Sequence, residues 1–244
     1  MPEQVLVTGA SGFIASHLII QLLNRGFTVK GSLRDMARGD ELAETLGAHA
    51  PLDALQLVEA DLTRDYGWDE AVEGCHYVLH VASPLPRVIP RDRDALVGPA
   101  REGALRVLRA AEAAGVKRVV MTASTACICY GHGNTGRVFT EEDWSDPDGA
   151  DNSAYTRSKT LAELAAWDFI NKSGSTLELT TINPGAVLGP VLEPDYGTSA
   201  EIVLKIMSGD FPGMPNLGFP IVDVRDVADL HIRAMENPAA AGQR

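Results

Sequence analysis

Residues 8–15 read Thr8-Gly9-Ala10-Ser11-Gly12-Phe13-Ile14-Ala15, and they are the strongest indication of the fold in this sequence. It follows an apolar run at 4–8 and opens an amphipathic run at 12–25. Gly9 permits a tight turn, Gly12 lets backbone N–H groups approach a pyrophosphate, and Ala15 allows close helix–sheet packing. The N-terminus of the following helix adds partial positive charge. In this setting the pattern predicts a dinucleotide-binding loop rather than an ordinary glycine-rich turn.

The rest of the chain alternates short β-branched runs with amphipathic runs. We expect strands at 4–8, 27–33, 55–59, 77–81, 116–123 and 177–182. Helices are expected between them at 12–25, 41–46, 68–73, 99–114 and 152–173, with Asp151 or Asn152 capping the last. Such alternation predicts right-handed crossovers and a doubly wound parallel α/β sheet, the Rossmann arrangement.

Two segments, 131–150 and 185–220, are rich in glycine and proline and follow strand ends, where open α/β sheets bind ligands. We therefore predict a dinucleotide-binding Rossmann domain at 1–184, part of a small substrate lobe at 185–220 and a return to the Rossmann domain at 221–244. The sequence stops at Arg244, where another strand would fit, so either the sheet ends there or the chain, and with it the lobe, is incomplete at the C-terminus. Aromatic side chains of these segments either line a substrate pocket or fill small cores beneath the loops: Trp144, Tyr196, Phe211 and Phe219.

The composition narrows the possible partners. The chain has 244 residues, of which 45% are hydrophobic and 22% charged, which is typical of one globular α/β unit. Its 33 acidic and 21 basic residues give a net charge of −12, which disfavours a nucleic-acid partner and an anionic membrane surface. There is no apolar stretch of roughly 20 residues and no signal-peptide pattern before the first strand. We expect no membrane association and a cytoplasmic location.

No residue pattern indicates a metal site. The three cysteines, Cys75, Cys127 and Cys129, lack disulfide or C-x-x-C metal spacing and are expected to be reduced and mostly buried. The acids at 223, 226 and 229 are better explained by the start of a helix, because acidic side chains favour a first helical turn.

The end of the second predicted strand carries positive charge. The sequence there is Gly31-Ser32-Leu33-Arg34-Asp35, with Arg38 following. Arg34 is placed to pair with a ribose 2′-phosphate and Arg38 to assist, since guanidinium geometry suits phosphate. Asp35 is expected to begin the helix or orient the arginine. The pattern favours NADP(H) over NAD, and the alternative is a solvated charge pair.

Three further residues suggest acid–base chemistry. Ser124 follows a strand, and Tyr155 and Lys159 are spaced to share one face of the next long helix. Free tyrosine is a poor acid–base catalyst at neutral pH, but a neighbouring ammonium favours its phenolate form. Ser124 could then hold a carbonyl oxygen. The alternative is a surface tyrosine and lysine beside an unrelated serine.

With the glycine loop, these residues resemble the extended short-chain dehydrogenase/reductases. Finer detail resembles the branch of dihydroflavonol and cinnamoyl-CoA reductases, including microbial aldehyde and ketone reductases. The supporting segments are Leu33-Arg34-Asp35, Asp61-Leu62, His80-Val81-Ala82-Ser83-Pro84 and Asn183-Pro184-Gly185-Ala186-Val187-Leu188-Gly189-Pro190. The resemblance implies NADPH-dependent reduction of an aldehyde or ketone to an alcohol.

The resemblance also implies roles for single residues. Ser124 and Tyr155 polarise the substrate oxygen, Tyr155 donates the proton, and Lys159 binds the nicotinamide ribose. The other residues implied to bind the cofactor are Gly9, Ser11, Gly12, Phe13, Ile14, Arg34, Arg38, Asp61, Leu62, Val81, Ala82, Ser83, Pro184, Val187 and, from a weaker match, Ser199.

The resemblance has departures and leaves alternatives open. Glu102 stands where many relatives carry an asparagine of a proton relay. One rival is a nucleotide-sugar epimerase or dehydratase, although the dehydratases' Ser-Thr-Asp-Glu strand end is Ser124-Thr125-Ala126-Cys127 in this chain. Another is a non-catalytic NADP-sensing regulator. Relatives pair through two long helices, here 99–114 and 152–173, or remain monomeric, so both a monomer and a homodimer stay open.

Overall fold

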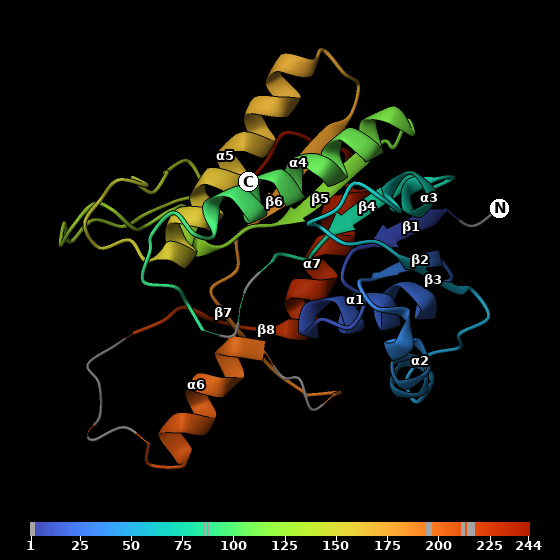
Figure 1. Cartoon of the computed structure of the whole chain (residues 1–244), viewed down its shortest axis with the longest axis horizontal. Coiled ribbons are helices and arrows are strands. Elements are labelled where there is room, and N and C mark those ends of the chain that lie inside the picture. The colour runs from blue at the N-terminus through green and yellow to red at the C-terminus, as the bar shows by residue number, and fades with distance from the viewer. Residues whose placement is uncertain (1–2, 85, 87, 194–196, 211–212, 214–217) are drawn as a thin grey trace.

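A parallel six-stranded sheet forms the centre of the described chain, in the order β3-β2-β1-β4-β5-β6 (Figure 1). The computed structural model describes residues 3–84, 86, 88–193, 197–210, 213 and 218–244. The strands are β1 (Gln4–Val7), β2 (Thr28–Leu33), β3 (Leu55–Glu59), β4 (Tyr77–His80), β5 (Arg118–Thr122) and β6 (Glu178–Ile182). All five neighbouring pairs in this sheet are parallel, which confirms the predicted doubly wound α/β fold.

Helices cover both faces of this sheet (Figure 1). One layer contains α1 (Phe13–Asn24), α2 (Gly39–Gly47) and α7 (Val224–Glu236). The other contains α3 (Trp68–Val72), α4 (Val97–Ala113) and α5 (Ala154–Ser173). Every residue of β4 and β5 is buried, because side chains on both faces of a covered parallel sheet enter a core. Leu6 packs into the core beneath α3, α4 and α5, whereas Val5 and Val7 pack into the core beneath α1, α2 and α7.

The 185–220 segment holds regular elements that the expected strands and helices did not include. The segment contains β7 (Ala186–Leu188) and α6 (Gly197–Met207), and β7 pairs in parallel with β8 (Ile221–Asp223) as a separate two-stranded sheet. The many glycines and prolines around the amphipathic run at 200–207 hid a helix that its own periodicity supports. Of the described residues, no helix is long and apolar enough to cross a lipid bilayer.

The predicted cap of α5 was also wrong. Ser153 caps the helix, because its hydroxyl accepts a hydrogen bond from the Thr156 N–H at 3.1 Å and the Thr156 hydroxyl accepts one from the Ser153 N–H. Asn152 instead donates to the Asp146 carbonyl, and the Asp151 carboxylate accepts from the Gly131 N–H. Both predicted caps thus fasten the 131–150 segment beside the start of α5.

Candidate active site

A cleft of about 530 Å³ runs along the carboxyl ends of the central strands. It lies beside the point between β1 and β4 where the strand order reverses, the usual ligand site of such sheets. Every residue predicted to bind cofactor or take part in catalysis lines it, apart from Ser199. Ser199 belongs to α6, and its side chain lies outside the described part of the structure.

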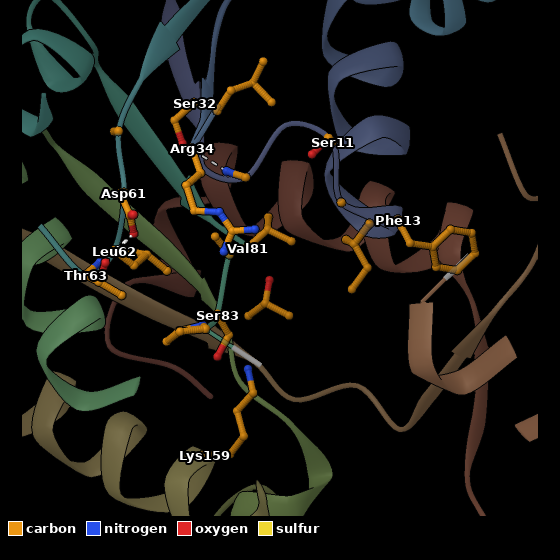
Figure 2. Close-up of a pocket in the computed structure, with 18 of the residues that line it drawn as sticks. Ser11, Phe13, Ser32, Arg34, Asp61, Leu62, Thr63, Val81, Ser83 and Lys159 are labelled. Atoms are coloured by element: carbon orange, nitrogen blue, oxygen red, sulfur yellow. Dashed lines mark hydrogen bonds between the residues drawn. The ribbon is translucent and has the colours of Figure 1, made fainter. Parts of the chain in front are cut away.

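The glycine loop forms one wall of the cleft (Figure 2). Gly9 has a φ of 69°, and a Cβ there would lie 2.8 Å from the Cβ of Ala82, so this position requires glycine. Gly12 caps α1 without a side-chain hydrogen bond, and no acidic residue follows in the first turn. The first N–H groups of a helix have no intrahelical partner. This wall therefore offers uncapped donors and partial positive charge to an anion.

Thr8 joins the glycine loop to the segment after β4. Its hydroxyl oxygen accepts hydrogen bonds from the N–H groups of Val81 and Ala82, at 3.1 and 3.0 Å. The Thr8 hydroxyl therefore donates its proton to Nδ1 of His80, 3.0 Å away. Burial, with help from the Lys159 ammonium, lowers the pKa of His80 to about 3, which keeps the imidazole neutral. His80 is thus a packing residue, and it supports the 81–84 wall of the cleft.

Two arginines stand at one end of the cleft. Arg34 reaches from the end of β2 into the cleft (Figure 2), and no hydrogen bond or ion pair holds it among the described residues. Arg38 is already engaged, because it donates to the Ser11 hydroxyl and the Glu193 carboxylate, both at 3.3 Å. Asp35 caps the short 3₁₀ helix Met36–Arg38, as predicted for its role at a helix start. Arg34 is therefore the guanidinium at this end that is free to bind a phosphate.

Asp61 and Leu62 line the cleft beside Arg34 (Figure 2). Burial opposes ionisation of Asp61, but hydrogen bonds from the Thr63 N–H and hydroxyl outweigh it and hold the pKa of Asp61 below its ordinary value. The carboxylate thus stays charged and fixed at neutral pH.

Ser124, Tyr155 and Lys159 gather at the opposite end of the cleft. Ser124 begins the 3₁₀ helix Thr125–Cys127, and its hydroxyl oxygen accepts the Ala126 N–H at 3.1 Å, which leaves the hydroxyl proton to donate. Tyr155 lies in the first turn of α5 and Lys159 one turn later, and the Lys159 side chain points into the cleft near Ser83 (Figure 2). Pro184 and Val187 line the cleft from the segment after β6.

Glu102 and His132 are not among the residues that line the cleft. Glu102 is on the half-exposed side of α4, where it pairs with Arg101 and Arg109. His132 bonds to the Trp144 carbonyl and stacks on the ring of Phe139. Of the other aromatic residues predicted to line a pocket or fill a small core, Phe219 is half-exposed, and Tyr196 and Phe211 fall outside the described residues.

The remaining predictions concern metals and thiols. Asp223 caps α7 by accepting the Arg225 N–H, and no group of three metal-binding side chains occurs within the described ranges. The three cysteines are free thiols, two of them buried. Burial raises the pKa of the Cys75 thiol to about 11, so it is not a reactive thiolate at neutral pH.

The sequence reasoning missed several residues that shape the cleft. Ser32 accepts the Gly9 N–H at 3.0 Å, and Thr63 fixes Asp61 as described above. A single polar residue after a strand is only a weak sequence signal for a binding site. The available signal was that the ends of β2 and β3 meet at this edge of the sheet, where Ser32 and Thr63 lie. Glu163, a fully buried carboxylate on α5, was missed altogether, because its eight-residue spacing from Tyr155 matches no common motif.

The residues present fit a phosphorylated dinucleotide. A glycine cradle that a Cβ would fill and an uncapped helix N-terminus suit a pyrophosphate. Arg34 suits a ribose phosphate beyond it. The serine, tyrosine and lysine at the far end can polarise a carbonyl oxygen and supply a proton.

Comparison with known proteins agrees with this geometry. The chain matches the NAD dependent epimerase/dehydratase family over residues 5–244. It is 41% identical to "Cinnamoyl-CoA reductase CAD2" of Medicago truncatula, over 98% of this chain and 74% of that protein. It is 35% identical to "Tetraketide alpha-pyrone reductase 1" of Arabidopsis thaliana, over 98% of this chain and 74% of that protein.

Solved structures give the same result. The yeast methylglyoxal/isovaleraldehyde reductase Gre2 complexed with NADPH superposes with a TM-score of 0.86 and 30% identity, over 98% of this chain and 76% of that one. The NADPH complex of Gre2 from Candida albicans superposes with a TM-score of 0.85 and 34% identity, over 100% of this chain and 77% of that one. The predicted resemblance is confirmed: the chain belongs to the NAD-dependent epimerase/dehydratase family, the extended short-chain dehydrogenase/reductases.

Proposed function

We propose that the protein is an NADPH-dependent carbonyl reductase that converts an aldehyde or ketone to an alcohol. The observation that carries this proposal is the single cleft that joins an unengaged Arg34 at one end to Ser124, Tyr155 and Lys159 at the other. The reaction consumes one carbonyl compound, one NADPH and one proton, and releases the alcohol and NADP⁺. The relatives named as reductases support the same reaction class.

The cofactor is held in this proposal along the full length of the cleft. Arg34 binds the 2′-phosphate, and Arg38 assists when it leaves Glu193. The uncapped N–H groups of α1 bind the pyrophosphate beside Ser11, Phe13 and Ile14. Asp61 and Leu62 contact the adenine, and the 81–83 and 184–187 segments enclose the nicotinamide.

NADPH, when bound, supplies the hydride from its nicotinamide ring. The hydroxyl protons of Ser124 and Tyr155 bond to the carbonyl oxygen and stabilise the negative charge that develops there. Tyr155 then gives its hydroxyl proton to this oxygen. Lys159 holds the nicotinamide ribose, and its ammonium stabilises the tyrosinate that remains.

The proposal extends to the surroundings of the enzyme. Residues 185–220 form part of the substrate lobe, while 1–184 and 221–244 form the dinucleotide-binding domain. The substrate is a small carbonyl compound, and the relatives named for methylglyoxal, isovaleraldehyde and a tetraketide α-pyrone make aldehydes, α-ketoaldehydes and ketones the classes to examine first. The enzyme acts in the cytoplasm, as a monomer or as a homodimer paired through α4 and α5.

NADPH oxidation in the presence of a panel of aldehydes, ketones and diketones tests the proposal. We expect turnover with NADPH, much weaker turnover with NADH, and loss of activity in Tyr155→Phe. Tyr66→Phe is the matched control, since it removes a hydroxyl from an exposed tyrosine outside the cleft. Tight NADPH binding without turnover of any carbonyl would instead favour a cofactor-sensing regulator.

A further inference from the structure

Glu163 is a buried carboxylate that the mechanism above leaves without a role. It lies on α5, one helical turn after Lys159 and two after Tyr155, and its side chain is 0% exposed. Residues at this spacing share one face of a helix. A carboxylate is rarely buried to this extent unless its charge is paired and its oxygens are hydrogen-bonded.

Each oxygen of Glu163 accepts a hydrogen bond from the end of β6. Oε1 accepts the Thr181 hydroxyl proton at 2.7 Å, and Oε2 accepts the amide proton of Asn183 at 2.9 Å. The Arg244 guanidinium bonds to both oxygens, with Nε 2.9 Å from Oε1 and Nη2 3.2 Å from Oε2. The negative charge is therefore balanced inside the protein, and no lone pair is left to bind a substrate.

The partners of Glu163 lead directly to the catalytic end of the cleft. The amide nitrogen of Asn183 also donates to the Ser124 carbonyl at 3.2 Å, and the Thr125 N–H donates to the Pro184 carbonyl at 3.0 Å. Because the Asn183 nitrogen faces two acceptors, the orientation of this amide is fixed. One side chain of α5 thereby connects the serine turn with the segment behind the nicotinamide.

Arg244 extends the same network to the 131–150 segment. It donates to the carbonyls of Glu141 and Asp143, both at 2.7 Å, and its guanidinium stacks 3.5 Å from the centre of the Trp144 ring. These contacts belong to the 131–150 segment, which has no regular helix or strand to hold it. The ion pair with Glu163 therefore anchors this segment against α5.

We propose that Glu163 is a positioning residue for carbonyl reduction, which holds Ser124 and the 183–184 segment in register with Tyr155 and Lys159. The inference rests on the proposed function, because it assigns Glu163 to the same reaction. Ser124, the 183–184 segment and Tyr155 sit on three different parts of the chain, so their spacing depends on what joins those parts. A misplacement of about 1 Å at reacting groups can cost about 100-fold in rate.

Glu163→Gln tests the proposal with the smallest change in shape. The glutamine amide nitrogen takes the place either of Oε1, facing Thr181 and Arg244 Nε, or of Oε2, facing Asn183 and Arg244 Nη2. It faces an Arg244 donor in both orientations, so at least one hydrogen bond of the network is lost. We expect kcat to fall about 10- to 100-fold. We also expect the kinetic isotope effect from NADPH deuterated at the nicotinamide C4 to increase, because hydride transfer becomes rate-limiting.

Cofactor binding provides a readout that does not depend on turnover. Adenosine 2′,5′-bisphosphate represents the adenine half of NADPH and does not reach Ser124 or Lys159. Glu163→Gln should keep its affinity for this fragment while its affinity for NADPH falls several-fold. An unchanged ratio of the two affinities contradicts the proposal.

The matched control lies on β6, the strand that also contains Thr181. Glu178 pairs with the buried Arg118 at the opposite end of β6, at 2.7 Å. Glu178→Gln should lower the melting temperature while it keeps the wild-type kcat and isotope effect. If Glu163→Gln does not fold, Asn183→Ala cuts the link to Ser124 while the Glu163–Arg244 pair remains, and the same loss of kcat is expected.

The outcomes separate this inference from the proposed function. If the wild type reduces carbonyls and Glu163→Gln keeps the wild-type kcat and isotope effect, only the positioning role is refuted. The role is also refuted if Glu178→Gln loses as much kcat as Glu163→Gln, since both effects would then be general destabilisation. If the wild type reduces no carbonyl, the proposed function fails, and the ratio of the two affinities alone decides the role of Glu163.

Discussion

Arg34 should set the preference of the enzyme for NADPH over NADH. Its guanidinium projects into the cleft from the end of β2, and no described hydrogen bond or ion pair has to break before it binds a phosphate. Arg38, in contrast, is held by Ser11 and Glu193. Arg34→Ala therefore removes a cation of this end of the cleft that has no hydrogen bond or ion pair among the described residues.

The magnitude follows from the exposure of Arg34. Hydrogen bonds to a charged group contribute about 1.5–3 kcal/mol. Because the side chain is exposed, solvent and salt screen part of that energy, and the lower half of the range applies. Arg34→Ala should then weaken NADPH binding about 10- to 40-fold.

Titration of NADPH and NADH into both proteins measures this effect. NADH has no 2′-phosphate, so its affinity should change less than about threefold. Arg38→Ala is the control. It should weaken NADPH binding less than Arg34→Ala does, because Arg38 has to break its contact with Glu193 before it can bind a phosphate. The difference in NADPH affinity between the wild type and Arg34→Ala should also become smaller as the salt concentration rises. Equal losses for NADPH and NADH, or no loss for either, would refute the assignment.

Three further outcomes follow from the described contacts. Gly9→Ala should lower the melting temperature, and it should lower the affinity for NADPH at least about tenfold, because the new Cβ would lie 2.8 Å from the Cβ of Ala82. Calorimetry measures the melting temperature and titration measures the affinity. A wild-type melting temperature together with a wild-type affinity would contradict this prediction. Arg118→Met should cost about 3–5 kcal/mol in urea unfolding, since Arg118 is 1% exposed and holds three carbonyls at the end of α7 as well as Glu178; a loss below about 1 kcal/mol would contradict this role. Burial lowers the pKa of His80 to about 3 and that of His231 to about 4, so below pH of about 6.5 the unfolded chain binds protons that the folded chain excludes. Stability should therefore be full above that pH and fall as pH drops, by up to about 2.7 kcal/mol per unit for the pair, and a flat profile between about pH 5 and 7 would exclude this linkage.

The glycine loop and the strand periodicity were sufficient to predict the central fold. Residues 8–15 lie between a buried strand and a helix, so their local chemistry has one structural solution, and the predicted order of strands and helices is confirmed. The cap of α5 could not be chosen from sequence, because Asp151, Asn152 and Ser153 can all cap a helix. Contacts with the 131–150 segment engage the first two and leave Ser153 for the helix.

The cleft was predictable where a motif has fixed spacing along one element. Tyr155 and Lys159 share a helix face, and Arg34 ends a strand at the edge where ligands bind. The Glu163 network was not predictable in this way, since its partners come from β6 and from residue 244. Such contacts exist only once the sheet has brought distant segments together.

Deuterium in the cofactor shows directly whether the hydride reaches the carbonyl carbon of the substrate. NADPH with deuterium at both hydrogen positions of the nicotinamide C4 is incubated with the wild type and a carbonyl compound that it consumes, and the alcohol is examined by mass spectrometry. We expect one deuterium on the former carbonyl carbon with the wild type, and a rate at least about 100-fold lower with Tyr155→Phe. Alcohol without deuterium, or an unchanged rate in Tyr155→Phe, would contradict reduction by hydride transfer with Tyr155 as the proton donor.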